Sequence, residues 1–178
     1  MVAPAQPRGL AFLLSPELTP GRACGPCMAC CTCMRIGELE KPIDTHCPNE
    51  QAVGGGCSIY AQRPQSCAAF ECLWLQGLVT GDDRRRPDQL GLIFTFGASA
   101  AGQTRPLIMV WEAWSQAADT GPARHLLMRL EQRVMFVLKR WGKPEHSRYA
   151  LHGPGGQVEK YRITGTATGF RLETLNQG

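Results

Sequence analysis

The chain has 178 residues, of which 43% are hydrophobic and 19% are charged, and its formal net charge is +4. This length fits one compact domain or two small lobes, and no segment approaches the roughly 20 apolar residues of a membrane span. The positive charge does not by itself indicate nucleic-acid binding. Two zinc sites with four thiolates each would carry about −4 together and bring the folded protein near neutrality.

Residues 1–20 are predicted to be a flexible N-terminal segment. The longest apolar run in this segment covers residues 10–14 and is flanked by prolines, which makes it too short for a secretory signal. We therefore expect a cytoplasmic protein in a reducing compartment, where clustered cysteines bind metal or carry out redox chemistry. The odd count of nine cysteines also fits a closed set of disulfides poorly.

Residues 21–80 are predicted to be a cysteine-cluster metal-binding region, because all nine cysteines lie within it. Two Cys-x-x-Cys pairs overlap as Cys24, Cys27 and Cys30, and this spacing lets a turning backbone hold two sulfurs near one ion. The region is rich in glycine and proline and so buries little apolar surface. Bound metal would therefore supply much of its folding energy.

One helix is predicted in this region, beginning at Pro64 and extending to Leu78 with apolar residues at helical spacing. Cys67 would lie in its first turn, where backbone N–H groups favour a thiolate. Because Cys72 follows by five residues, it cannot share a strict helical face with Cys67. We expect the helix to bend, or the two thiols to serve different centres.

The doublet Cys30-Cys31 indicates two centres that share a wall, or one ligand beside a reserve thiol, because adjacent side chains point in different directions. Zinc prefers four thiolates in a tetrahedron. The triple at the start of the region, with a distant Cys47-Pro48, instead partly matches the ligand pattern of a bacterial iron–sulfur cluster. His46 is an alternative zinc ligand. We favour an iron–sulfur cluster over Zn2+, because closely spaced thiolates can attach to different irons.

Residues 81–89 are predicted to be a connecting loop, and residues 90–178 an α+β lobe. The expected strands cover residues 90–96, 106–114, 147–152 and 158–164. A long helix is expected over residues 122–141, where apolar residues recur at helical spacing. The predicted fold class is thus α+β, with a loop-rich, metal-stabilised cysteine region packed on a small antiparallel sheet with one long helix.

The cysteine region resembles the bacterial YkgJ-type cysteine-cluster proteins, described as zinc- or iron-chelating CxxCxxCC domains. The resemblance spans residues 24–75 and rests on Cys24-Gly25-Pro26-Cys27-Met28-Ala29-Cys30-Cys31, on Cys47-Pro48, on residues 56–67, and on Phe70 and Cys72. It implies eight metal ligands, Cys24, Cys27, Cys30, Cys31, Cys47, Cys57, Cys67 and Cys72, and leaves Cys33 as an extra thiol.

A similar domain occurs in flagellin lysine methylases, where an iron–sulfur cluster is the expected cofactor, and this chain looks like the stand-alone form. The family often has a basic residue where this chain has Ala68, which puts an anion-binding role at that position in doubt. Arg63 can pair with the anionic thiolates.

Three functions remain open at this point. The first is a cytoplasmic metal-binding protein whose centre is structural or electron-carrying, with a protein partner binding through the C-terminal lobe. The second is an iron–sulfur-dependent redox or protein-modifying enzyme with Cys33 as a reactive thiol, although the second half offers no acid–base constellation. The third, a zinc-ribbon nucleic-acid module, is disfavoured because the Lys and Arg residues are dispersed. We expect the first.

Overall fold

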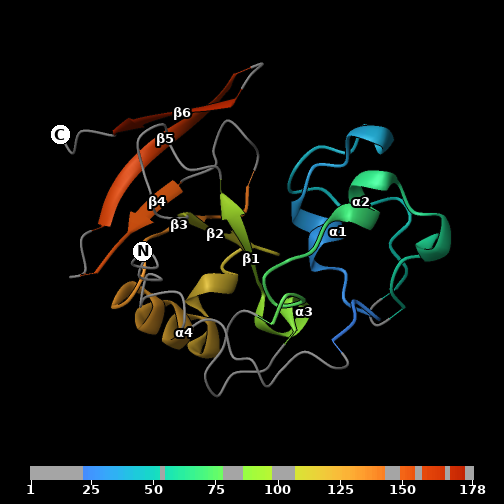
Figure 1. Cartoon of the computed structure of the whole chain (residues 1–178), viewed down its shortest axis with the longest axis horizontal. Coiled ribbons are helices and arrows are strands. Elements are labelled where there is room, and N and C mark those ends of the chain that lie inside the picture. The colour runs from blue at the N-terminus through green and yellow to red at the C-terminus, as the bar shows by residue number, and fades with distance from the viewer. Residues whose placement is uncertain are drawn as a thin grey trace, which may run out of the picture.

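The computed structural model describes residues 22–52, 55–77, 86–97, 107–142, 149–154, 158–166 and 169–174. Over these residues the chain has an α+β fold, as predicted, with one mixed sheet in the order β1-β2-β3-β4-β5-β6 (Figure 1). The strands are β1 Leu92–Gly97, β2 Leu107–Glu112, β3 Phe136–Lys139, β4 Tyr149–His152, β5 Val158–Thr166 and β6 Gly169–Thr174. The α-helices are α1 Ala29–Cys33, α2 Gln65–Ala69, α3 Pro87–Leu90 and α4 Gly121–Glu131, and the 3-10 turns are Gly37–Leu39, Tyr60–Gln62 and Ala117–Asp119. None of the described helices is long and apolar enough to cross a membrane.

The sheet is not purely antiparallel, so that part of the prediction is wrong. β2 and β3 run parallel, with Ile108 opposite Phe136, while the other four strand pairs are antiparallel. Two parallel neighbours require the chain to return to the starting end of the sheet before the second strand begins. Helix α4 lies in this connection.

The long helix predicted over residues 122–141 is also wrong in its second half. Helix α4 ends at Glu131, and Phe136–Lys139 forms strand β3 with all four of its residues buried. A strand that is covered on both faces reads as a continuous apolar run, and such a run places apolar residues at helical spacing too. The pattern alone could not separate the two structures here.

The remaining predicted elements lie close to the residue ranges that were predicted for them. The hairpin of β1 and β2 and the pairing of β4 with β5 are confirmed, whereas β6 was not predicted. The predicted N-terminal segment 1–20 and residues 81–85 of the predicted loop lie outside the described part of the chain. The end of that loop is helical instead, because Pro87 starts α3.

Helix α2 is shorter than expected. It ends at Ala69, since Phe70 takes an extended conformation with φ −79° and ψ 120°. The neighbouring residues Leu73 and Trp74 then pack in different places, Leu73 in the core under α4 and Trp74 in the core under the cysteine region. A continuous helix cannot send neighbouring side chains to opposite faces of a sheet.

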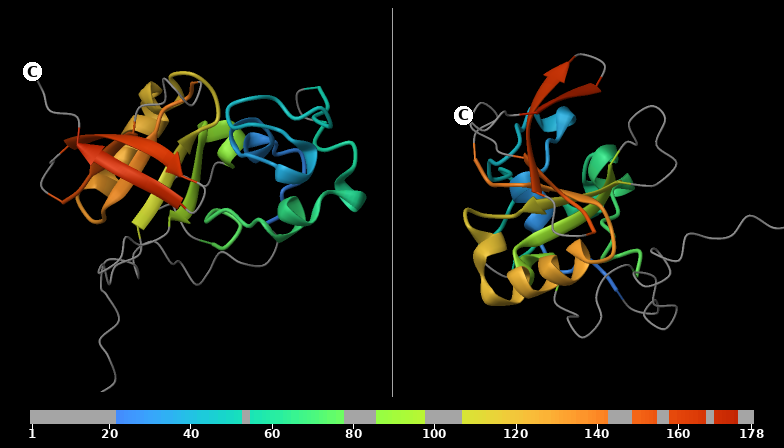
Figure 2. Two further views of the ribbon diagram at one scale, coloured as in Figure 1. Left: turned by 90° about the horizontal axis from the view of Figure 1, so that it is seen from above. Right: turned by 90° about the vertical axis from the view of Figure 1, so that its left-hand side faces the viewer.

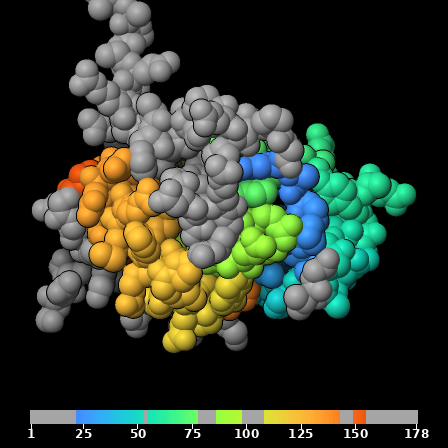
Figure 3. All heavy atoms as spheres, turned by 90° about the horizontal axis from the view of Figure 1, so that it is seen from below, coloured from blue at the N-terminus to red at the C-terminus, as the bar shows by residue number. Residues whose placement is uncertain are grey.

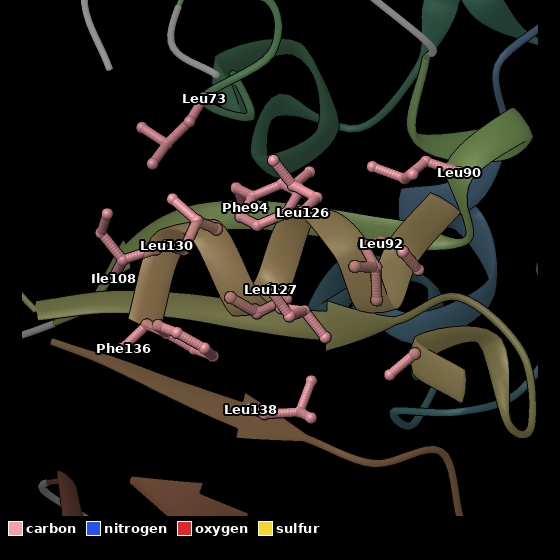
Figure 4. Close-up of a cluster of buried hydrophobic side chains, with 13 residues drawn as sticks. Leu73, Leu90, Leu92, Phe94, Ile108, Leu126, Leu127, Leu130, Phe136 and Leu138 are labelled. Atoms are coloured by element: carbon pink, nitrogen blue, oxygen red, sulfur yellow. The ribbon is translucent and has the colours of Figure 1, made fainter. Parts of the chain in front are cut away.

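One face of the sheet is covered by α4, as Figure 4 shows. The strand residues on this face are Leu92, Phe94, Ile108, Val110, Phe136 and Leu138, and those of the helix are Ala123, Leu126, Leu127 and Leu130. All of these side chains are buried. Burial of this apolar face is the main contribution to the stability of the lobe.

The other face of the sheet is covered by the cysteine region. Ile93 of β1 and Trp111 of β2 pack there against Ala29 and Cys33 of α1 and against Cys72. Figure 2 shows the cysteine region beside the first strands, with β5 and β6 farthest from it. The thiol-bearing segments therefore pack against the first strands of the sheet.

Candidate metal centre

Helix α1 positions the first group of thiols. A tight turn precedes it, in which the Cys27 N–H donates to the Cys24 carbonyl oxygen at 2.8 Å and Gly25 has φ +49°. One side of α1 faces the sheet, where Thr32 Oγ1 donates to the Ala113 carbonyl oxygen at 2.9 Å. This anchor leaves the neighbouring side chain of Cys31 outside the apolar core.

The side chains of Cys30 and Cys31 influence one another directly. This mutual interaction is the largest influence on both thiols: it raises the pKa of Cys30 and lowers the pKa of Cys31. The charges of Cys27 and Cys24 raise the pKa of Cys30 further. The doublet therefore belongs to one group of interacting thiols.

Thiols from later segments join this group. Burial is the main cause that raises the pKa of Cys72, and the charge of Cys24 adds to it. Burial likewise raises the pKa of Cys67, with further contributions from Cys31 and Cys47. The pKa of Cys67 is therefore raised, although its place near the start of α2 had led us to expect a favoured thiolate.

Seven of the eight proposed ligands are connected in this way, namely Cys24, Cys27, Cys30, Cys31, Cys47, Cys67 and Cys72. Cys57 is placed near them by its backbone. It forms an antiparallel bridge with Glu50, and a Cβ added to the preceding Gly56 would lie 3.1 Å from the carbonyl oxygen of Gly25. The chain segment that carries Cys57 therefore lies against the turn between Cys24 and Cys27.

Two further features of this site were not predicted from the sequence. Burial is the main cause that raises the Cys27 pKa to about 12, and Asp88 of α3 lies close enough to contribute to the shift. Arg86 holds the Asp88 carboxylate with two bonds of 3.0 Å. Figure 3 shows α3 between α4 and the N-terminal part of the cysteine region. The second feature is Lys41, which is buried close to Cys31 and Cys47.

Arg63, which we expected to pair with the thiolates, is held by Tyr60. Its guanidinium carbon is 4.1 Å from the centre of the Tyr60 ring. The Tyr60 side chain is the main cause that raises the Arg63 pKa, and the charges of Cys24 and Cys67 contribute. By contrast, His46, the alternative zinc ligand, is exposed and its Nδ1 lies 3.0 Å from Glu50 Oε2.

Cys33 has different surroundings from the eight proposed ligands. Its side chain is fully buried against the sheet, and burial raises its pKa to about 12. The charges that act on it come from Lys139, Asp44 and Lys41, and none of these is a cysteine.

All nine cysteines are free thiols. Within the described ranges, no group of three or more His, Cys, Asp or Glu side chains is placed so that it could hold a metal ion. The structure therefore brings reduced thiols into electrostatic contact without forming the eight-ligand cage that the sequence predicts. The donor chemistry nevertheless fits both metals, because thiolates are the preferred ligands of structural zinc and of iron–sulfur clusters. Comparisons of the chain with family models, curated proteins and solved structures found no match.

Proposed function

We propose that this chain is a cytoplasmic metal-binding protein of the YkgJ type. Its ligands would be Cys24, Cys27, Cys30, Cys31, Cys47, Cys57, Cys67 and Cys72. The observation that carries the proposal is that free thiols from separate segments of the chain, Cys27, Cys30 and Cys72, pack into one cluster around α1. The mutual influence of the cysteines on their pKa values supports it. An iron–sulfur cluster bound there would supply one-electron transfer, and Zn2+ would supply a structural crosslink.

Metal ions and protons compete for the buried thiols of this site. Burial raises the pKa of Cys27, Cys67 and Cys72, so these groups are protonated in the absence of metal. Coordination to a metal ion removes such protons, and the free energy of coordination is added to that of folding. The loop-rich region around α1 and α2 would gain the stability that its small apolar contacts do not provide.

The centre is proposed to be structural or electron-carrying, and the iron–sulfur cluster remains the preferred cofactor. The adjacency of Cys30 and Cys31 favours a cofactor with several metal atoms, because neighbouring thiolates can then attach to different ones. The alternative enzyme, with Cys33 as its reactive thiol, gains no support from the surroundings of Cys33. A reactive cysteine is accessible and has a lowered pKa, whereas Cys33 is buried and has a raised one.

The test is to purify the full chain without oxygen from cells supplied with iron, and to measure iron, zinc, acid-labile sulfide and visible absorption. We expect brown protein that contains iron and sulfide and whose absorption bleaches on reduction. Colourless protein with stoichiometric zinc would refute the cluster but keep the metal-binding function. Protein that contains neither metal, even after anaerobic reconstitution, would refute the function itself.

A matched pair of substitutions tests the ligand set. Cys27→Ser should lower the metal content, because Cys27 belongs to the interacting thiols. Cys33→Ser should leave the metal content unchanged, because Cys33 lies against the sheet among charged groups. Equal metal loss in both variants would contradict this division of the thiols.

A further inference from the structure

Lys41 places a positive charge inside the cysteine region. The residue is only 4% exposed, and its Nζ donates to the carbonyl oxygens of Thr32 at 3.2 Å, Met34 at 2.5 Å and Pro42 at 3.0 Å. These bonds use all three N–H groups of an ammonium. The backbones of Ile36 and Lys41 form an antiparallel bridge, in which each N–H donates to the carbonyl oxygen of the other residue. This bridge fixes the position of Lys41 near the C-terminal end of α1.

This ammonium has no carboxylate partner within ion-pair distance in the part of the chain that the structure describes. The nearby buried carboxylate, Asp44, is paired with a different lysine, Lys139 of β3. A buried charge without a counter-charge is unfavourable, and carbonyl oxygens compensate it only in part. Backbone carbonyl dipoles therefore surround the Lys41 ammonium, but no carboxylate in the described part of the chain is paired with it.

Thiols flank the carbonyl groups that Lys41 holds, because Thr32 lies between Cys31 and Cys33 and Met34 follows Cys33. Burial lowers the pKa of Lys41, and negative charge on Cys33, Cys47, Cys31 or Asp44 acts in the opposite direction. Cys33 stays protonated because burial raises its pKa to about 12, whereas Cys31 and Cys47 are among the proposed ligands. Four thiolates around Zn2+, or around a cubane cluster, leave a net charge of about −2, which is the kind of charge that Lys41 lacks.

We infer that Lys41 is the internal counter-ion of the proposed metal centre, a positioning residue that stabilises thiolate-bound metal through its charge without contacting the metal. This inference rests on the proposed function. According to this inference, the metal-loaded centre bears a net negative charge. Lys41 interacts with this charge from the side of Cys31 and Cys47. If the cofactor is an iron–sulfur cluster, Lys41 also favours its reduced state, because reduction adds negative charge beside a fixed cation.

The variant that tests this is Lys41→Gln, measured in the full chain loaded with metal. The glutamine amide still donates to the carbonyl oxygens around it, so the substitution removes the charge while keeping hydrogen bonds at the end of α1. Loss of an outer partner of a metal site typically weakens affinity about 10- to 100-fold. We expect a loss of this size in chelator competition, and a more negative midpoint potential if the protein holds a cluster.

Two further variants separate charge from structure. Lys139→Gln removes an equally buried lysine whose charge is already paired with Asp44, so it should destabilise the fold but keep the wild-type metal affinity. Lys41→Arg keeps the charge and should recover part of the affinity lost in Lys41→Gln. If Lys41→Gln does not fold, the comparison of Lys41→Arg with Lys41→Met after anaerobic refolding with metal decides the question, because only the charged variant should retain metal.

The outcomes distinguish this inference from the proposed function. Wild-type protein that binds no metal refutes the function and the inference together. Wild-type protein that binds metal, with Lys41→Gln at the same affinity and the same potential, refutes only the counter-ion role. Equal losses in Lys41→Gln and Lys139→Gln would also refute it, because a purely structural effect would then explain both.

Discussion

The buried ion pair between Asp44 and Lys139 joins the cysteine region to the sheet, and its removal is a sharp test of how the two parts are held together. The Asp44 and Lys139 side chains are 1% and 0% exposed. Asp44 Oδ2 also accepts a hydrogen bond of 3.0 Å from the Gly142 N–H, while its Oδ1 is buried without a partner. The backbone of Asp44 is left-handed, with φ 52°.

Asp44→Asn removes the charge with little other change, because asparagine has the same shape and tolerates a left-handed backbone. The substitution leaves the Lys139 ammonium buried without its counter-charge, and such a loss typically costs about 3–5 kcal/mol. The amide oxygen can still accept from Gly142, so we expect the free energy of unfolding to fall by about 3 kcal/mol.

The measurement is denaturant unfolding followed by tryptophan fluorescence, with and without metal. Trp111 is a suitable reporter, since its ring centre is 5.8 Å from Lys139 Nζ. The double variant Asp44→Asn/Lys139→Met removes both charges and should recover most of the lost stability, to within about 1 kcal/mol of wild type. A loss below about 1 kcal/mol in the single variant, or a double variant as unstable as the single one, would refute the reasoning.

Three further outcomes are expected. Stripping metal should reduce amide-exchange protection in residues 22–77 more than in β1 to β3, and equal protection with and without metal would argue against a metal-stabilised region. In metal-free protein at pH 8, Cys33 should be alkylated more slowly in the folded than in the denaturant-unfolded chain in mass-spectrometric mapping, because a pKa of about 12 instead of 9.0 leaves about a thousandfold less thiolate. Phe136→Ala should cost about 3–5 kcal/mol in thermal unfolding, whereas Phe96→Ala, at a 46% exposed position, should cost far less.

Local sequence patterns were sufficient for the fold class and for most strands. The runs that became β1, β2 and β5 are rich in β-branched and aromatic residues, and these residues favour strands wherever the sheet is built. The grouping of all nine thiols in one region is likewise visible without a structure, because cysteine spacing is a property of the chain itself. The eight candidate ligands could therefore be named in advance, mostly from a family resemblance.

The arrangement of these elements depended on contacts between distant residues. Phe136–Lys139 became a strand parallel to β2 because a place between β2 and β4 buries both of its faces, which the helix-like spacing of its apolar residues could not reveal. Lys41, Asp44 and Lys139 stand in polar or mixed sequence, where charged residues are normally solvated. Only the packing of the cysteine region against the sheet excludes water from these charges, and burial is what turns an ordinary lysine into an internal counter-ion.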